Sequence, residues 1–81
     1  MDKMDVDRRL AAVVASVLDL AASDIDLYSS ADSIEQWDSL AHLQVILDVE
    51  QNFDVRFSTE EIPQLTSVQR IQETLVRMRA L

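Results

Sequence analysis

The sequence contains no cysteine and no glycine, and it has a single proline and a single histidine. The absence of cysteine excludes a disulfide framework, a thiolate nucleophile and a cysteine-ligated metal. The absence of glycine excludes the glycine-rich loops that bring backbone amides up to a nucleotide phosphate. One histidine, His42, is too few for a site with several imidazole ligands, and we expect no metal site. These absences exclude most enzyme classes.

Basic residues are also scarce. Seven Lys and Arg stand against 15 Asp and Glu, which gives a net charge of −8. Because binding to a nucleic-acid backbone needs cations that displace counterions, we expect no nucleic-acid partner. Between Leu10 and Val55 there is no Lys or Arg at all, whereas nine acidic residues fall in this span. Such a surface either keeps a small protein soluble or attracts basic partners, and composition alone leaves both interpretations open.

Long hydrophobic runs and targeting signals are missing. The longest apolar run extends from Leu10 to Ala15, far short of the roughly 20 residues that span a bilayer. Residues 1–5 lack the basic stretch and the apolar core of a secretory signal. With 81 residues, 48 % of them hydrophobic, the chain has room for a single domain over 1–81. We expect a soluble, cytoplasmic protein with no membrane contact.

The spacing of apolar residues predicts an all-α fold. A helix is expected over about 3–18, where apolar residues recur at i, i+4, i+7 and i+8 and where Asp2 and Asp5 suit the positive end of the helix dipole. Asp38 is a good N-cap for a second helix over 39–52.

Two capping boxes predict the remaining helices. Ser58 and Glu61 open a single helical turn that Pro63 stops. Thr66 and Gln69 open the last helix, whose apolar stripe is Val68, Ile71, Leu75 and Met78. The architecture is therefore a small four-helix bundle of three main helices and one short helix.

Two segments between these helices lack a helical period. Residues 19–37 read as a long loop, and loops of this length in small domains are often functional. Its apolar residues are expected to lie on the core: Ile25, Leu27, Tyr28 and Ile34. Trp37 is expected to pack at the entrance to the second helix. Residues 53–57 read as an extended connector with buried aromatics, since no other segment offers to pair with it as a strand.

Ser39 is the candidate functional residue. If Asp38 is the cap, Ser39 is the first helical residue, and an anion attached to its hydroxyl would meet free backbone amides and the helix dipole. The simpler interpretation is that both residues only begin a helix. The apolar side chains of this helix cover an arc of about 200°, wider than one core stripe needs. One edge contains Val45, Val49 and Phe53, and the other contains Leu40, Leu43 and Leu47. Either one of these edges contacts a partner, or the helix is deeply buried.

The residues of the second helix resemble a known family. Asp38-Ser39-Leu40, followed by Leu43, Val45-Ile46-Leu47, Val49-Glu50 and Phe53, is similar to the acyl carrier proteins. The likeness continues through the 53–57 connector, the 58–62 turn and Thr66-Ser67-Val68, and it covers nearly the whole chain.

This resemblance implies a carrier rather than an enzyme, with no catalytic residue. A phosphopantetheinyl transferase would move 4′-phosphopantetheine from coenzyme A to Ser39, which Asp38 and Leu40 flank. The thiol of this arm would hold acyl, aminoacyl or polyketide groups as thioesters. A ligase that loads acyl or aminoacyl groups would supply them, and downstream synthase or transferase enzymes would use them.

The resemblance also implies contact residues. Asp38 and Glu50 would meet Arg or Lys of partner enzymes, and Leu43 and Leu47 would supply apolar contacts. Ile62 and Leu65 would border the route of a bound acyl chain. The carrier would act as a monomer.

The sequence departs from the family pattern at three positions. Gln36 stands where many members have glycine, and Ala41 and Gln44 stand where carriers of primary fatty-acid synthesis have acids. We therefore expect a carrier dedicated to a specialised biosynthetic pathway. The main alternative is an unmodified, acidic helical module that binds a basic protein partner.

Three other patterns are weaker. Asp38, Ser39 and His42 suggest a hydrolytic triad, but the glycine-flanked nucleophile turn is absent. The tripeptide Asp32-Ser33-Ile34 repeats the Asp-Ser pair without a helical stripe after it. A calcium-loop spacing lacks the required glycine, and its acids are Asp24, Asp26, Asp32 and Glu35.

Overall fold

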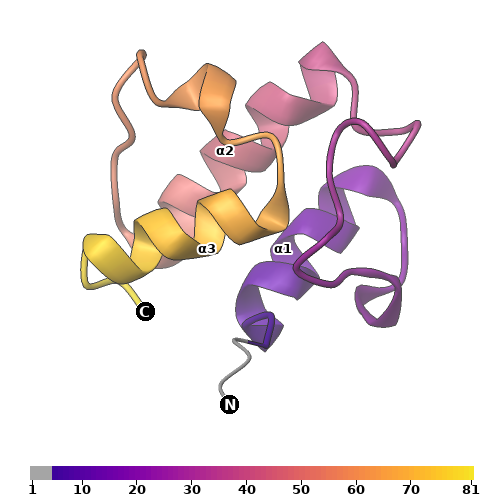
Figure 1. Ribbon diagram of the computed structural model, residues 1–81, viewed down its shortest axis with the longest axis horizontal. Helices are drawn as coiled ribbons and strands as arrows, with labels where there is room; N and C mark the ends of the chain where they lie inside the picture. Colours follow the sequence, from indigo (N-terminus) through magenta and orange to yellow (C-terminus); the bar gives the residue numbers. More distant parts are fainter. Residues whose placement is uncertain (1–4) are drawn as a thin grey trace.

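The computed structural model describes residues 5–81, and its regular elements are helices (Figure 1). In chain order they are α1 (Arg8–Leu18), η1 (Ala22–Asp24), α2 (Ser39–Phe53), η2 (Ile62–Gln64) and α3 (Val68–Arg77), where η marks a 3-10 helix. Residues 5–81 contain no strand, only an isolated bridge between Ser30 and Ser67. The expected all-α class is confirmed.

The three α-helices pack around one apolar core, and α1 contacts both α2 and α3 (Figure 1). Each helix contributes the residues that recur at helical spacing on one face. The largest side chains withdrawn completely from solvent are Leu10, Val14, Val45, Val49, Val68, Ile71 and Leu75. At the outer end of α2, the guanidinium of Arg9 lies 4.5 Å from the centre of the Phe53 ring and donates to the carbonyl of Asn52. This contact ties the start of α1 to the end of α2.

The first helix begins later than its apolar pattern predicts. Asp7 is its N-cap, and one carboxylate oxygen accepts the backbone N–H groups of Arg9 and Leu10 at 3.0 Å each. Residues 5–7 are not helical, so the predicted start at 3 and the role of Asp5 in the first turn are wrong. Asp2 lies outside the described residues.

The long loop is ordered against the start of α3. The N–H of Ala31 donates to the Thr66 carbonyl, and the N–H of Val68 donates to the Ser29 carbonyl, both at 2.9 Å. Ile25 is buried, as predicted, and Leu27 and Ile34 are half-buried against the core. Tyr28 is 79 % exposed, so its predicted place on the core is wrong. Tyr28 lies in a turn, in which its backbone N–H donates to Asp26 Oδ1 at 2.8 Å, and this turn directs the ring outward.

The second helix matches its predicted bounds and extends one residue further, to Phe53. Phe53 therefore ends the helix instead of opening the connector. It is buried, and so is Phe57 at the other end of the unpaired connector, as predicted.

The predicted box forms, since Ser58 and Glu61 exchange side-chain to backbone hydrogen bonds of 3.1 and 3.2 Å, but it closes a turn and does not cap η2, which begins only at Ile62. Pro63 nevertheless lies inside η2 and does not stop the turn before it.

The start of the last helix differs by one residue from the prediction. Ser67, not Thr66, is the N-cap, and its hydroxyl accepts the Arg70 N–H at 3.2 Å. The predicted box of Thr66 with Gln69 is therefore wrong. The predicted stripe is buried at Val68, Ile71 and Leu75, but α3 ends before Met78, which is partly exposed.

Candidate functional site

Ser39 is the first residue of α2 and is exposed to solvent. Asp38 precedes it in an extended conformation, and its Oδ1 accepts the Ala41 N–H at 2.9 Å. The predicted N-cap is thus confirmed. The first amides of a helix have no intrahelical acceptor, so the positive end of the α2 dipole lies at Ser39. An anionic group on the Ser39 oxygen would be stabilised there, although the Asp38 carboxylate offsets part of that effect.

The second Asp-Ser pair lies in a different environment. Ser33 is part of the ordered loop, where its hydroxyl bonds to the Ser30 carbonyl at 3.2 Å and accepts the Ser30 N–H at the same distance. No helix begins at this serine. Its hydroxyl therefore stabilises a turn, as the sequence predicts for a loop serine.

Three leucines form an exposed stripe along α2. Leu40, Leu43 and Leu47 are 79 %, 53 % and 51 % exposed, whereas Val45 and Val49 on the opposite side are fully buried. At 100° per residue the three leucines lie within an arc of about 60°. The two apolar edges of this helix therefore face different surroundings, one the core and the other solvent. A continuous exposed apolar surface of this kind is typical of an interaction site.

Glu50, the second acid expected at a partner surface, also has an internal contact. It is half-buried, and its Oε2 accepts the Phe57 N–H at 2.8 Å. This bond holds the connector after α2 against the helix. Glu50 lies one turn after Leu47 and two turns after Leu43 on the same side of the helix, so its carboxylate borders the leucine stripe.

His42 is turned away from Ser39. Its Nδ1 accepts the Trp37 Nε1–H at 3.0 Å, and its Nε2 lies 2.8 Å from the Ile62 carbonyl oxygen. A general base needs a ring nitrogen within reach of the serine hydroxyl, and both nitrogens of His42 have other partners. The triad of Asp38, Ser39 and His42 is therefore not assembled. The ring is half-buried, with Nε2 at the start of η2.

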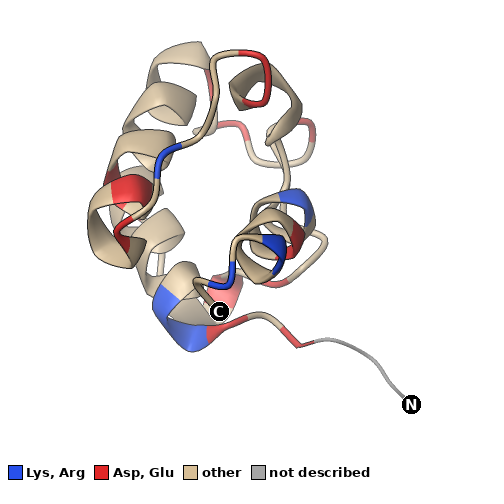
Figure 2. Cartoon of the chain, turned by 90° about the vertical axis from the view of Figure 1, so that its left-hand side faces the viewer, with Lys and Arg blue, Asp and Glu red and all other residues tan. Residues whose placement is uncertain are grey.

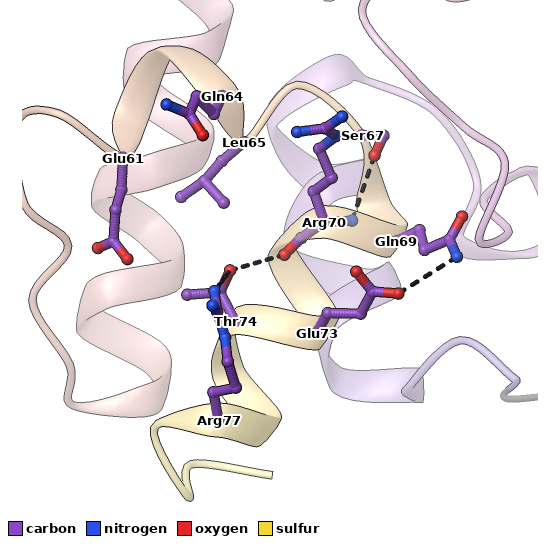
Figure 3. Close-up of a pocket in the computed structure, with 9 residues that line it drawn as sticks. All are labelled: Glu61, Gln64, Leu65, Ser67, Gln69, Arg70, Glu73, Thr74 and Arg77. Carbon is purple, nitrogen blue, oxygen red and sulfur yellow. Dashed lines mark hydrogen bonds between the residues drawn. The ribbon is translucent and has the colours of Figure 1, made fainter.

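A cavity of about 760 Å³ lies between η2 and α3 (Figure 3). Leu65, expected to border a bound chain, lines it, but Ile62 does not. The remaining lining is polar: Glu61, Gln64, Ser67, Gln69, Arg70, Glu73, Thr74 and Arg77. These residues were not predicted from the sequence, although Arg70, Glu73 and Arg77 share one face of a helix by their spacing. Ile62 instead contacts the first turn of α2 through His42.

The charges are distributed unevenly over the molecule. Figure 2 shows basic segments at the start of α1 and toward the end of the chain, and acidic segments in the loop and along α2. Arg56 in the connector is the first basic residue after Arg9. The leucine stripe and Ser39 thus lie in a part of the chain that carries only negative charge, which would attract a basic surface at long range.

Neither a metal site nor a membrane span is found in residues 5–81. No group of three or more His, Cys, Asp or Glu side chains in this range is arranged to hold a metal ion. No helix there has the length and hydrophobicity to cross a bilayer.

Comparisons with known proteins do not assign a function. No protein-family model matches the sequence, and no curated protein matches it. The features that bear on function are those of α2 and its surroundings.

Proposed function

We propose that this protein is a carrier that holds reaction intermediates as thioesters on a 4′-phosphopantetheine arm attached to Ser39. The proposal extends the resemblance of the second helix to acyl carrier proteins, with the fold being a carrier-type bundle in which η2 is the short fourth helix. The observation that carries it is the position of Ser39, exposed at the first residue of α2 and directly followed by the exposed leucine stripe.

The attachment site suits a phosphodiester. The Ser39 hydroxyl oxygen would attack the phosphorus that bears the pantetheine of coenzyme A, the remaining nucleotide would leave, and the hydroxyl proton would pass to a base of the transferase. The new phosphodiester would lie against the amides of the first turn of α2, which favour an anion. Asp38 and Leu40 flank this position, and the carboxylate of Asp38 stays bonded to the Ala41 N–H. The thiol that the chain lacks is supplied by the arm.

The partner surface would be the outer side of α2. Leu43 and Leu47 present apolar area that no other described part of the chain covers. Asp38 and Glu50 lie at its two ends and would meet Arg or Lys of a phosphopantetheinyl transferase, a loading ligase or a downstream synthase or transferase. Glu50 Oε2 is already bonded to the connector, so a partner cation would bind at Oε1. Binding of that cation would then depend on the conformation of the connector.

The cargo would pass along η2. The carbonyl of Ile62 lies 2.8 Å from the imidazole of His42, one turn beyond Ser39, so η2 is close to the arm. Leu65 lines the cavity beyond it. We propose that the carrier is monomeric and cytoplasmic. We also propose that it serves a specialised pathway, because Ala41 and Gln44 leave this surface less acidic than that of primary fatty-acid carriers.

The deciding experiment is the intact mass after incubation with coenzyme A, magnesium and a broad-specificity transferase. The wild type is expected to gain the mass of one phosphopantetheine, and Ser39→Ala is expected to gain none. Ser39→Ala retains Ser33, so its unchanged mass would also exclude the second Asp-Ser pair. Ser33→Ala is the matched control and should be modified like the wild type.

A folded wild type that gains no mass with this transferase and with a panel of dedicated ones would overturn the carrier proposal. The leucine stripe would then fit the alternative, an unmodified acidic module that binds a basic partner. In that case Ser39→Ala would leave partner binding unchanged, whereas Leu47→Ala would weaken it.

A further inference from the structure

One imidazole connects three segments beside Ser39. His42 on the first turn of α2 bonds to Trp37 at the end of the long loop and to Ile62 at the start of η2. The rings of Trp37 and His42 are stacked at an interplanar angle of 29°, with their centres 6.1 Å apart. The connection is independent of any group on Ser39, because it involves neither the hydroxyl nor the N-cap carboxylate.

The partners of His42 determine its protonation state. The indole N–H of Trp37 can only donate, so Nδ1 of His42 must carry a lone pair. The carbonyl of Ile62 can only accept, so Nε2 must carry the proton. The hydrogen-bond pattern is therefore satisfied by one form alone, the neutral imidazole protonated at Nε2.

Protonation of Nδ1 would break one of these two bonds and keep the other. The Nε2–H would still donate to Ile62, but the new Nδ1–H would point at the indole N–H of Trp37. Trp37 is only 2 % exposed, so its N–H would lose its acceptor in a place that water does not reach freely. A buried donor without an acceptor is unfavourable, and the indole would move to find one.

We propose that His42 is a proton-operated latch: in its neutral form it joins Trp37 to η2, and on protonation it releases the Trp37 indole at the entrance to α2. This inference goes beyond the carrier proposal and does not depend on it. Its effect would reach Ser39, which is two residues after Trp37 and three before His42.

The charged residues next to Trp37, His42 and Ile62 in the sequence are acidic. Asp38 lies on the same turn of α2, Glu35 lies in the loop that leads to Trp37, and Glu60 and Glu61 precede Ile62. The carboxylates of Asp38 and Glu61 are held by backbone N–H groups of Ala41 and Ser58. On α3, Arg70 and Arg77 line the cavity beside η2 together with Glu61.

The test is an NMR titration of the ¹⁵N-labelled full chain from about pH 8 to pH 5, the range in which histidine usually titrates. The chain has one histidine and one tryptophan, so both ring signals are assigned without ambiguity. At high pH the ring is expected to be protonated at Nε2 alone. On acidification the Trp37 indole signal should shift with the same midpoint as the His42 ring, and its proton should exchange with water about tenfold faster.

Two variants separate a latch from a general effect of acid. In His42→Gln the indole signal should be independent of pH, and in Trp37→Phe the His42 ring should titrate without changing the amide signals of Asp38 and Ser39. A neutral ring protonated at Nδ1, or an indole signal that ignores the His42 titration, would overturn the proposal. If either variant fails to fold, the wild-type titration decides alone, since it contains both signals.

Discussion

Gln72 and Asp7 are 65 positions apart in the sequence, yet the side-chain oxygen of Gln72 accepts the backbone N–H of Asp7 at 2.7 Å. The side-chain nitrogen of the same residue donates to the Asp5 carbonyl at 2.8 Å. Gln72 is 4 % exposed, so a buried amide on α3 satisfies the backbone of the segment before α1 in the way that a neighbouring strand would. This pair of bonds keeps residues 5–7 out of the first helix.

Replacement of Gln72 should therefore destabilise the protein. Gln72→Leu keeps the side-chain bulk but leaves a donor and an acceptor of the backbone unpaired, and we expect the free energy of unfolding to fall by about 1–3 kcal/mol. Urea denaturation measures this loss, and hydrogen exchange should show it at the amide of Asp7. Gln69→Leu on the exposed side of α3 is the matched control and should change stability by less than about 0.5 kcal/mol. Equal losses in the two variants would contradict this role of Gln72.

The same contact explains why the start of α1 was not predicted. The apolar period continues from Val6 into the helix, and Asp5 is a good residue for a first turn, so local pattern alone favours an early start. The bonds from Gln72 come from the other end of the chain and cannot be read from the sequence around Asp5. By contrast, Asp38 is bonded within its own turn, and for that reason its cap was predicted to the residue.

The start of α3 was also predicted wrongly because of a bond to a distant part of the chain. Thr66 and Ser67 are both acceptable N-caps, and the capping-box pattern favours Thr66. The structure selects Ser67 because the carbonyl of Thr66 is bonded to the loop residue Ala31. The helical period of α2 separates a leucine edge from a valine edge, but only the packing of the core shows that the leucine edge faces solvent. The polar cavity beside Leu65 was not predictable, because it needs the packing of η2 against α3.

Two helices end in residues with left-handed backbone conformation. Asp19 after α1 and Asp54 after α2 have φ angles of 60° and 55°. Glycine takes this conformation without the steric cost of a Cβ atom, although it loses more entropy on folding. We expect Asp54→Gly to raise the melting temperature and the free energy of unfolding by about 0.5 kcal/mol. Asp48→Gly within α2 is the control and should lower that free energy by about 1 kcal/mol.

The two roles of Asp38 can be separated by substitution. Asp38→Ala removes the cap of α2 and should cost about 1 kcal/mol of stability, whereas Asp38→Asn keeps a capping oxygen and should cost far less. Both variants remove the charge that we propose meets the transferase, so both should raise the KM for modification of Ser39. Thermal denaturation and the modification kinetics measure the two effects. Normal kinetics in a folded Asp38→Asn variant would show that the carboxylate acts only as a cap.

The leucine stripe and the core of α2 should respond oppositely to truncation. Val45 is fully buried, so Val45→Ala leaves a cavity and should lower the free energy of unfolding by about 2 kcal/mol. Leu47 is half-exposed, so Leu47→Ala should change stability by less than about 1 kcal/mol, yet it should slow modification of Ser39 or weaken binding of a basic partner.

The measurement for this pair is urea denaturation of each variant beside transferase kinetics at a temperature where both are folded. Val45→Ala serves as the control for the kinetics, because its side chain is fully buried and cannot be reached by a partner while the protein is folded. If Leu47→Ala is modified as fast as the wild type while Val45→Ala is slower, the rate of modification depends on the stability of α2 and not on its leucine stripe. The opposite order would assign recognition to the exposed leucines, because loss of the Leu47 isopropyl group at the surface affects a partner only where that partner contacts it.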